Sequence, residues 1–270
     1  MTAEIFTWYD ADDNPVILNN GTTYDVRWGV EGRLWPEYDF ITDEQYQKAG
    51  DRVNLIKVKP RTITLPLTVY GTSAADKLTN LRALEYAFDP MRGPGRLEVT
   101  TCDSLVKNLD CYCAVWNAAE STDTSGGTFF IFVVTLHAPY PYWYSGTAST
   151  QTWTAGTGWG PTNVTNPGQA YGYPVWTITP STALTGITLT NNNTGNVCQL
   201  STMSTTGSIT ITTQPGHESV LRGTTNYAGY MTSTSTLWPF VPGLNSITIA
   251  TTGGVPTSVV ATWYPNYLGV

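Results

Sequence analysis

The sequence has few charged residues. Aspartate, glutamate, lysine and arginine make up 12% of the 270 residues, about half of the usual share. The net charge is −7, so the chain lacks the basic stripe that displaces phosphate counterions, and direct DNA binding is not expected. No run of 18 apolar residues occurs, so no membrane span is expected. Residues 1–4 have neither a basic nor an apolar region, so no signal peptide is expected either.

Cysteine is also scarce, with four residues in the chain. Cys111 and Cys113 are separated by one residue, which places both on the same side of a strand. Zinc sites usually pair two or more C-x2-4-C or similar motifs, and this sequence has none. We therefore expect small buried thiols in a reducing compartment, with no metal and no cofactor. A metal site that recruits Cys102 and one of the two histidines is the alternative.

Residue patterns typical of catalysis are missing as well. Glycoside hydrolysis usually needs two carboxylates, but Glu218 is the only acidic residue after position 140. No G-x-S-x-G or H-E-x-x-H motif occurs. His217 lies next to Glu218 in the sequence, but catalytic groups have to converge in space. We predict that the chain is not an enzyme, and a hydrolase is the less favoured alternative.

The most informative stretch runs from Lys59 to Val99. It starts with apolar residues that alternate with polar ones: Ile63, Leu65, Leu67 and Val69. A period of two with β-branched residues predicts a half-buried strand. The stretch ends with a G-P-G turn at 93–95 and the start of a further strand.

A helix is predicted over residues 73–89, between these strands. Ser73 and Asp76 have the spacing of a capping box, and Asp89 precedes a proline that ends the helix. Four apolar residues share one helical face, which we expect to pack on the sheet: Leu78, Leu81, Leu84 and Phe88.

Composition changes abruptly near position 140, which predicts a domain boundary. Residues 141–270 contain one acidic and one basic residue, Glu218 and Arg222. We expect a mainly β protein with an N-terminal β-sandwich at 1–144 that carries the helix, and a C-terminal β-sandwich at 171–270 with seven short strands, one of them at 237–241. The segment 145–170 is rich in Gly, Thr, Ser and Asn, and is expected to be a linker or a belt between them.

The order of motifs resembles the distal tail proteins of phages with long non-contractile tails. The resemblance starts with the strand, the capped helix, the D-P turn and the G-x-G-x-L-x-V strand of 59–99. It extends over most of the chain through further segments: Tyr38–Thr42, His137–Tyr144, Leu237–Phe240, Pro242–Asn245 and Val260–Tyr267.

This resemblance implies a structural virion protein of the tail tip or baseplate, assembled in the host cytoplasm. Such a protein forms a homo-hexameric ring that joins the tail tube to the tip, and genome DNA passes through the ring without specific binding. The implied partners are the tail-tube protein above and a tail-tip hub or tail-associated lysin-type protein below. The resemblance also implies that the C-terminal domain is a galectin-like jelly roll at the periphery, a platform for other tip proteins such as receptor-binding proteins in host adsorption.

The outer face of the predicted helix is the candidate ring interface. The residues opposite to the apolar face combine one aromatic and one arginine with small neighbours: Ala75, Thr79, Arg82, Ala83 and Tyr86. Tyrosine and arginine are enriched where proteins meet, and small neighbours allow close approach. An ordinary solvated helix face is the alternative.

Carbohydrate binding by the C-terminal domain is the alternative function. A sugar ring would stack on an aromatic side chain, and the candidates are Trp176, Trp238 and Trp263. Against this, Trp238 and Trp263 lie within apolar stretches, where tryptophan is more often part of the core.

Overall fold

The computed structural model describes residues 4–44, 49–118, 127–154 and 159–270. The chain is mainly β, with one α-helix among these residues, which confirms the predicted fold class. It forms two compact units: unit 1 is Met1–Gly146 with Tyr267–Val270, and unit 2 is Thr147–Asn266. Unit 2 is therefore inserted, in sequence, before the last four residues of unit 1.

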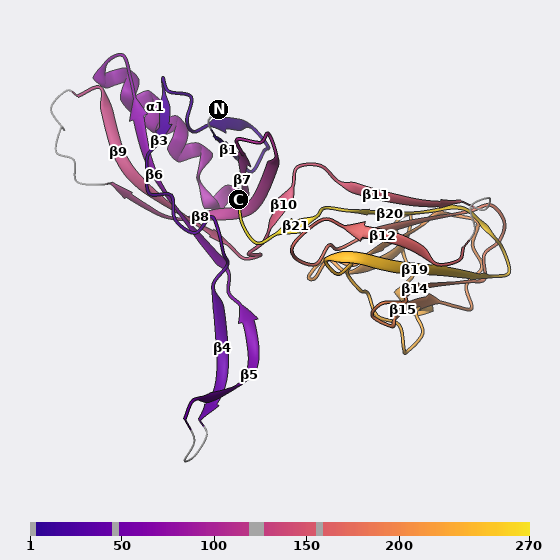
Figure 1. Ribbon diagram of the computed structural model, residues 1–270. Helices are drawn as coiled ribbons and strands as arrows, with labels where there is room; N and C mark the ends of the chain where they lie inside the picture. The colour runs from indigo at the N-terminus through magenta and orange to yellow at the C-terminus, as the bar shows by residue number, and fades with distance from the viewer. Residues whose placement is uncertain (1–3, 45–48, 119–126, 155–158) are drawn as a thin grey trace. The chain divides into compact units, whose positions relative to one another are not determined.

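Unit 1 contains a large curled sheet, the helix and a separate pair of strands (Figure 1). Its elements are β1 (Ile5–Tyr9), β2 (Pro15–Ile17), β3 (Tyr24–Val26), β4 (Tyr38–Glu44), β5 (Asp51–Val58), β6 (Arg61–Tyr70), α1 (Ala74–Ala87), the 3-10 turn η1 (Pro90–Arg92), β7 (Gly95–Thr100), β8 (Val106–Ala118), β9 (Phe129–Ala138) and β10 (Trp143–Ser145). The sheet has the order β2-β1-β7-β8-β9-β6-β3, and neighbouring strands are antiparallel. β10 pairs with β8 and with β21 (Asn266–Tyr267).

The core of unit 1 lies between α1 and the inner face of this sheet. The four alternating apolar residues of β6 are all buried there, as their period of two predicts: Ile63, Leu65, Leu67 and Val69. Aromatic rings from β1, the end of α1, β8 and β9 continue the core: Trp8 stacks on Phe88, and Trp116 stacks on Phe132. The helix is thus fixed against the sheet by large interlocking side chains.

β4 and β5 form a two-stranded sheet of their own, which we call the arm. Figure 1 shows the arm as a separate ribbon that extends beyond the sheet of unit 1. The strands are paired antiparallel from Tyr38↔Val58 to Glu44↔Asp51, with a β-bulge after Ile41. Most of the described side chains of β4 and β5 are exposed.

Unit 2 is a two-sheet sandwich. Its elements are β11 (Ser149–Thr154), β12 (Thr162–Asn166), β13 (Val175–Pro180), β14 (Gly186–Asn191), β15 (Asn196–Leu200), β16 (Ile209–Thr212), β17 (Ser219–Arg222), β18 (Thr225–Asn226), the 3-10 turn η2 (Ala228–Tyr230), β19 (Gly243–Thr252) and β20 (Pro256–Trp263). One sheet has the order β11-β20-β13-β16-β17-β18 and the other β12-β19-β14-β15. Residues from both sheets form a single apolar core.

Two expectations about this half are corrected. The segment 145–170 was expected to be a linker or belt, but it supplies β11 and β12, which pair with β20 and β19. Each of these strands buries one apolar side chain, Trp153 or Val164, and turns its threonines outward or to the margin. The predicted strand at 237–241 does not form, because Pro239 has no N–H to donate to a ladder. Its aromatic residues still enter the core.

Candidate functional site

The candidate site is the outer face of α1, and the start of this helix is fixed by local hydrogen bonds. Ser73 is the N-cap, because its hydroxyl oxygen accepts a hydrogen bond from the backbone N–H of Asp76 at 3.2 Å. The Asp76 carboxylate accepts from the backbone N–H and the hydroxyl of Thr72, at 2.7 and 2.9 Å, and these bonds lower the pKa of Asp76. The predicted cap is confirmed, although the second bond of the capping box reaches Thr72 instead of Ser73.

The end of the helix is fixed by Trp8 from β1. The Trp8 indole N–H donates to the Ala87 carbonyl at 2.7 Å, and its ring lies 4.4 Å from the ring of Phe88. The last carbonyls of a helix have no partner within the helix, so Trp8 satisfies one of them while it fills the core. This contact fixes the orientation of the helix about its own axis.

The buried face of the helix differs from the prediction at one position. Three of the four predicted residues pack against the core: Leu81, Leu84 and Phe88. Leu78 is 45% exposed, so the prediction that it faces the sheet is wrong. Lys77 takes the buried position beside Gly71, where an added Cβ would come within 2.2 Å of the Lys77 nitrogen. Leu78 lies ~100° farther round the helix than Lys77 and therefore reaches the surface.

The opposite face carries the predicted interface residues. All five are exposed: Ala75, Thr79, Arg82, Ala83 and Tyr86. Tyr86 is the largest of them and is 63% exposed. Leu78 borders the group and adds an exposed aliphatic side chain. The structure thus brings these residues together on one face, on which the larger side chains of Tyr86 and Leu78 lie among small neighbours.

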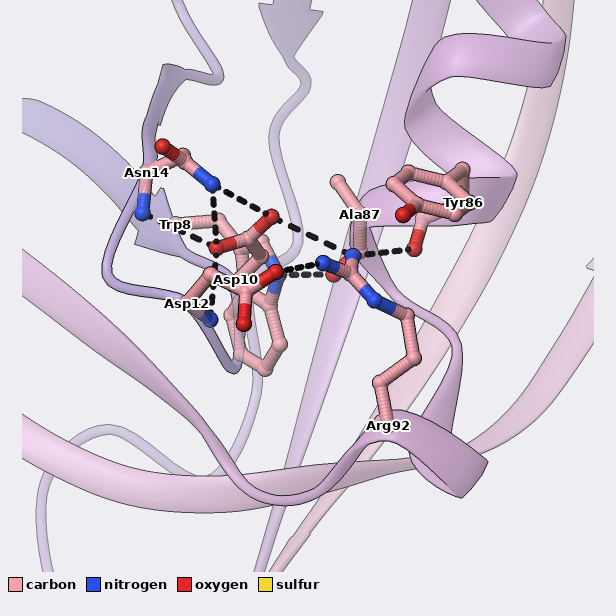
Figure 2. Close-up of polar contacts among 7 residues, drawn as sticks. All are labelled: Trp8, Asp10, Asp12, Asn14, Tyr86, Ala87 and Arg92. Carbon is pink, nitrogen blue, oxygen red and sulfur yellow. Dashed lines mark hydrogen bonds and ion pairs between the residues drawn. The ribbon is translucent and has the colours of Figure 1, made fainter.

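Figure 2 shows that Tyr86 is held in place by Arg92, a residue of η1. The Arg92 guanidinium carbon lies 4.0 Å from the centroid of the Tyr86 ring, which is a cation–π contact. Arg92 Nη1 donates to the Tyr86 carbonyl and to the Asp10 carboxylate, at 3.2 Å each, and Nη2 donates to the Asp12 carboxylate. Arg92 therefore connects the turn after β1 to the end of α1 and restricts the Tyr86 ring.

Asp10 is the buried end of this array. Its carboxylate accepts hydrogen bonds from the backbone N–H groups of Asp12 and Asn14, at 3.0 and 2.9 Å, and from the Asn14 side-chain amide. Burial raises the pKa of Asp10, but these bonds and Arg92 outweigh burial, and the pKa lies below its ordinary value. A carboxylate that stays charged and is occupied by donors acts as a clamp, not as a general base near neutral pH.

Asp10 and Arg92 were not identified as site residues from the sequence. The run from Asp10 to Asn14 has the composition of a turn in which an aspartate bonds the backbone two residues on, which accounts for its local bonds. Nothing in the sequence indicates that this turn meets Arg92, which lies 82 residues away.

The structure contradicts the hypothesis that three tryptophans of unit 2 bind a sugar. Trp176, Trp238 and Trp263 are between 1% and 3% exposed and belong to the core of unit 2. Trp176 packs edge-on against Trp238 and Phe240, and Phe240 packs edge-on against Trp263. A ring buried on both faces has no surface on which a sugar can stack.

In the part of the chain that the structure describes, no three His, Cys, Asp or Glu side chains come together as a metal site. Cys111 and Cys113 are both buried, and burial raises the pKa of the Cys113 thiol to about 11. No helix in the described ranges is long and apolar enough to span a membrane.

Comparison with known proteins gives one family match and several similar structures. Residues 167–267 match the family described as the siphovirus-type tail component, C-terminal domain. The crystal structure of SPP1 Dit (gp 19.1), a paradigm of hub adsorption apparatus in Gram-positive infecting phages, covers 97% of this chain and 99% of its own, with a TM-score of 0.72 and 15% identity. The resemblance to the phage distal tail proteins is confirmed.

Two phage P2 baseplate structures share this distal tail fold. The activated baseplate with Ca matches with a TM-score of 0.58 and 11% identity, covering 98% of each chain. The activated baseplate with Sr matches with a TM-score of 0.57 and 11% identity, covering 97% of this chain and 98% of that one. A search of curated protein sequences finds no match.

The family match covers one part of the chain, whereas the structural matches cover nearly all of it. The family match lies almost entirely in unit 2, from the segment after β12 to β21. Helix α1 and the arm lie outside this range, and only the structural matches extend into the rest of unit 1. At 15% identity these matches establish the fold of unit 1, and its surface residues have to be argued from their own geometry.

Proposed function

We propose that this chain is a non-catalytic structural protein of a phage tail tip, which forms a homo-hexameric ring between the tail tube and the tip. The observation that carries the proposal is the likeness to SPP1 Dit over 97% of this chain. The family match in unit 2 supports it independently, because it rests on sequence.

The ring joins a tail-tube protein on one side to a hub or tail-associated lysin-type protein on the other. With a net charge of −7, the chain repels phosphate, which suits a channel that genome DNA crosses without binding. The ring is assembled in the host cytoplasm and ends in the virion tail tip.

Unit 2 is a galectin-like platform at the periphery of this ring. Its single acidic and single basic residue give it almost no electrostatic steering, so the tip proteins that it holds, receptor-binding proteins among them, are recognised by shape and hydrogen bonds. The burial of its tryptophans supports a platform over a lectin.

The outer face of α1 forms the contact between subunits. A closed ring needs a heterologous contact, in which this face meets a different patch of the next copy. Tyr86 is suited to anchor it, because Arg92 already restricts its ring and less conformational entropy is lost on binding. Arg82 adds an exposed guanidinium beside it.

Imaging of the purified chain tests this function. We expect negative-stain images to show rings with a central pore, and Tyr86→Ala combined with Arg82→Ala to give monomers. Both side chains are exposed, so the melting temperature of the isolated subunit should change little. Gold-labelled antibodies against the chain should bind the tail tip of virions. A label elsewhere on the particle would exclude the proposed role.

A further inference from the structure

The two charged residues of unit 2 do not neutralise each other. Glu218 precedes β17 and Arg222 ends this strand, so they lie about 13 Å apart along the chain at ~3.3 Å per residue. The Glu218 carboxylate accepts instead from the backbone N–H of Gly216 at 2.7 Å. No other charged residue occurs between positions 141 and 270. Arg222 is therefore a cation for which unit 2 supplies no counter-charge.

Arg222 starts from a strand position that faces the core. It follows the buried Val220 by two residues and is opposite the buried Ile209 of β16, so these side chains share one side of the sheet. A cation on that side costs free energy unless it is paired or reaches water. Arg222 reaches water, because it is exposed at the end of β17. An uncharged residue would avoid this cost, so the charge itself calls for an explanation.

Arg222 lines a hollow of about 440 Å³ between the end of β17 and the loop before β16. The other lining residues are Thr206, Gly207, Ser208 and Gly223. Neither an apolar side chain nor a carboxylate is among these lining residues, so the hollow presents one positive charge, two hydroxyls and backbone groups. Its volume lies within the ~300–1,000 Å³ of small-molecule sites. The hollow thus has the size and the polarity to take a small polar anion.

Buried neighbours hold the guanidinium at this hollow. Arg222 Nη1 donates to the Thr205 hydroxyl oxygen at 3.4 Å, and the guanidinium carbon lies 5.3 Å from the centroid of the Tyr227 ring. Thr205 and Tyr227 are 3% and 7% exposed. Gly207 lies against the arginine stem, because an added Cβ would come within 3.2 Å of Arg222 Cδ. A guanidinium that is already restricted loses less conformational entropy when it binds a ligand.

Most of the hydrogen-bonding capacity of the hollow is unused. A guanidinium has five N–H donors, and among the residues that the structure describes only Thr205 accepts from Arg222. The Thr206 hydroxyl has no partner within the same described ranges. The Ser208 hydroxyl donates to the Ile178 carbonyl at 3.2 Å, so its oxygen can still accept. The planar fork of an arginine matches two oxygens of a carboxylate or a phosphate.

From this geometry we propose that the hollow binds a phosphate or carboxylate group carried by a small hydroxylated molecule, such as a sugar or a polyol. Arg222 pairs with the anionic group, the Thr206 hydroxyl donates to it, and Ser208 accepts from a hydroxyl of the ligand. An inorganic anion alone occupies only a few times the ~30 Å³ of a water molecule and would leave most of the hollow unfilled. Recognition uses charge and hydrogen bonds without ring stacking, so it does not need the buried tryptophans of unit 2. The site is separate from the contacts that form the ring.

Calorimetric titration of the full-length chain tests this site. Glycerol phosphate supplies the phosphate and glucuronate the carboxylate, and glycerol and glucose are their uncharged counterparts. We expect at least one of the two anions to bind, and neither uncharged compound to bind at the same concentration. Binding of glycerol phosphate alone identifies the recognised group as phosphate, and binding of glucuronate alone identifies it as carboxylate. The affinity should fall as NaCl is raised, because salt screens the charge of an exposed arginine.

Substitutions in the hollow separate the effect of charge from that of shape. Arg222→Gln removes hydrogen bonds from a charged donor, so the affinity for the anion should fall about 10- to 100-fold. Thr206→Val keeps the shape but removes the hydroxyl, and should weaken binding roughly 3- to 10-fold. Arg52→Gln is the matched control, because it removes the same charge from an exposed position in unit 1 and should bind like the wild type. All three positions are exposed, so the melting temperature of each variant should stay close to that of the wild type.

Three results would overturn the assignment of this site. The first is failure of both anions to bind at millimolar concentration, and the second is a folded Arg222→Gln variant that binds as tightly as the wild type. The third is inorganic phosphate that binds as tightly as both organic anions, which would exclude recognition of a hydroxylated ligand. The proposed function fails separately, because gold labelling away from the tail tip excludes it, whereas a chain that binds neither anion can still form the ring.

Discussion

Replacement of Arg61 tests how the last residues of the chain are tied into unit 1. Arg61 starts β6 and is 2% exposed. Its Nε donates to the Pro141 carbonyl at 2.6 Å, Nη1 to the Gly32 carbonyl at 2.6 Å and Nη2 to the Leu268 carbonyl at 2.5 Å. Leu268 comes after unit 2 in the sequence, so this one side chain connects three distant segments.

The expected magnitude depends on which of two effects is larger. Burial disfavours the charged guanidinium and lowers the pKa of Arg61 to about 10. Hydrogen bonds from a charged donor contribute about 1.5–3 kcal/mol each, and three of them exceed the several kcal/mol that burying one ion costs. Arg61→Leu removes the charge but leaves three carbonyls without their donor, so the free energy of unfolding should fall by about 2–5 kcal/mol.

Urea unfolding and amide exchange measure this effect. Arg61→Lys keeps the charge without the planar fork of donors, so its loss should be intermediate, about 1–3 kcal/mol. Arg52→Leu is the control, because Arg52 is exposed and its loss should cost less than about 0.5 kcal/mol. The Val270 amide donates to the Arg33 carbonyl at 3.1 Å and should exchange faster in Arg61→Leu. A variant within about 1 kcal/mol of the wild type, with unchanged Val270 exchange, would refute the reasoning.

Two substitutions and one labelling experiment test the Asp10 carboxylate, the core of unit 1 and the buried thiols. The pKa of Asp10 is lower in the folded than in the unfolded chain, so the stability that its carboxylate contributes is complete above the unfolded pKa of ~3.9 and is lost as pH falls through the folded pKa. Asp10→Asn should therefore lower the free energy of unfolding at pH 7, and progressively less below ~pH 4. An equal loss of stability in acid would contradict this. Gly95→Ala places a Cβ 2.1 Å from the buried Trp8 ring and should cost about 1–3 kcal/mol in urea unfolding, against no measurable cost for Gly160→Ala, where the space is open. In the native protein a thiol reagent should modify the exposed Cys102 first, because burial raises the pKa of the other three thiols; their equally fast labelling would show that the core opens readily.

Local patterns predicted the central strand and the helix because the same residues decide both local and tertiary structure there. The alternation from Ile63 to Val69 matches its burial, and Ser73 caps the helix as its spacing indicates. Leu78 was misplaced because helical periodicity gives an apolar stripe about 100° wide but not its exact centre. The packing of Gly71 against Lys77 sets that centre, and this contact depends on the path of the chain before the helix.

The strands β11 and β12 were missed because their sequences are mostly polar. Thr, Ser and Gln surround a single buried Trp153 in β11, so no apolar alternation marks the strand. Threonine is nevertheless β-branched and fits a pleated, half-buried surface. The strand order supplies the missing information, since β11 lies at a sheet edge beside β20 and needs only one residue in the core.

The helix face could be predicted as a surface, but its anchoring could not. The five predicted interface residues of α1 follow from the period of 3.6 residues per turn, and all five are exposed. The restraint on Tyr86 depends on Arg92 and Asp10, which meet only when the sheet is formed. The exposure of the arm was also beyond the sequence, because Phe40 and Ile56 have the pattern of ordinary core strands.

The two units satisfy their buried polar groups in different ways. In unit 1, charged side chains hold irregular segments, as Arg61 and Asp10 do. In unit 2 the fully buried Asn245 bonds both the N–H and the carbonyl of Val241, and accepts from Asn191 as well. A neutral amide that both donates and accepts replaces a buried charge without the cost of desolvating an ion. Unit 2 can therefore dispense with charge in its interior, and the neutrality of its surface is a separate property, one that suits partners recognised by shape.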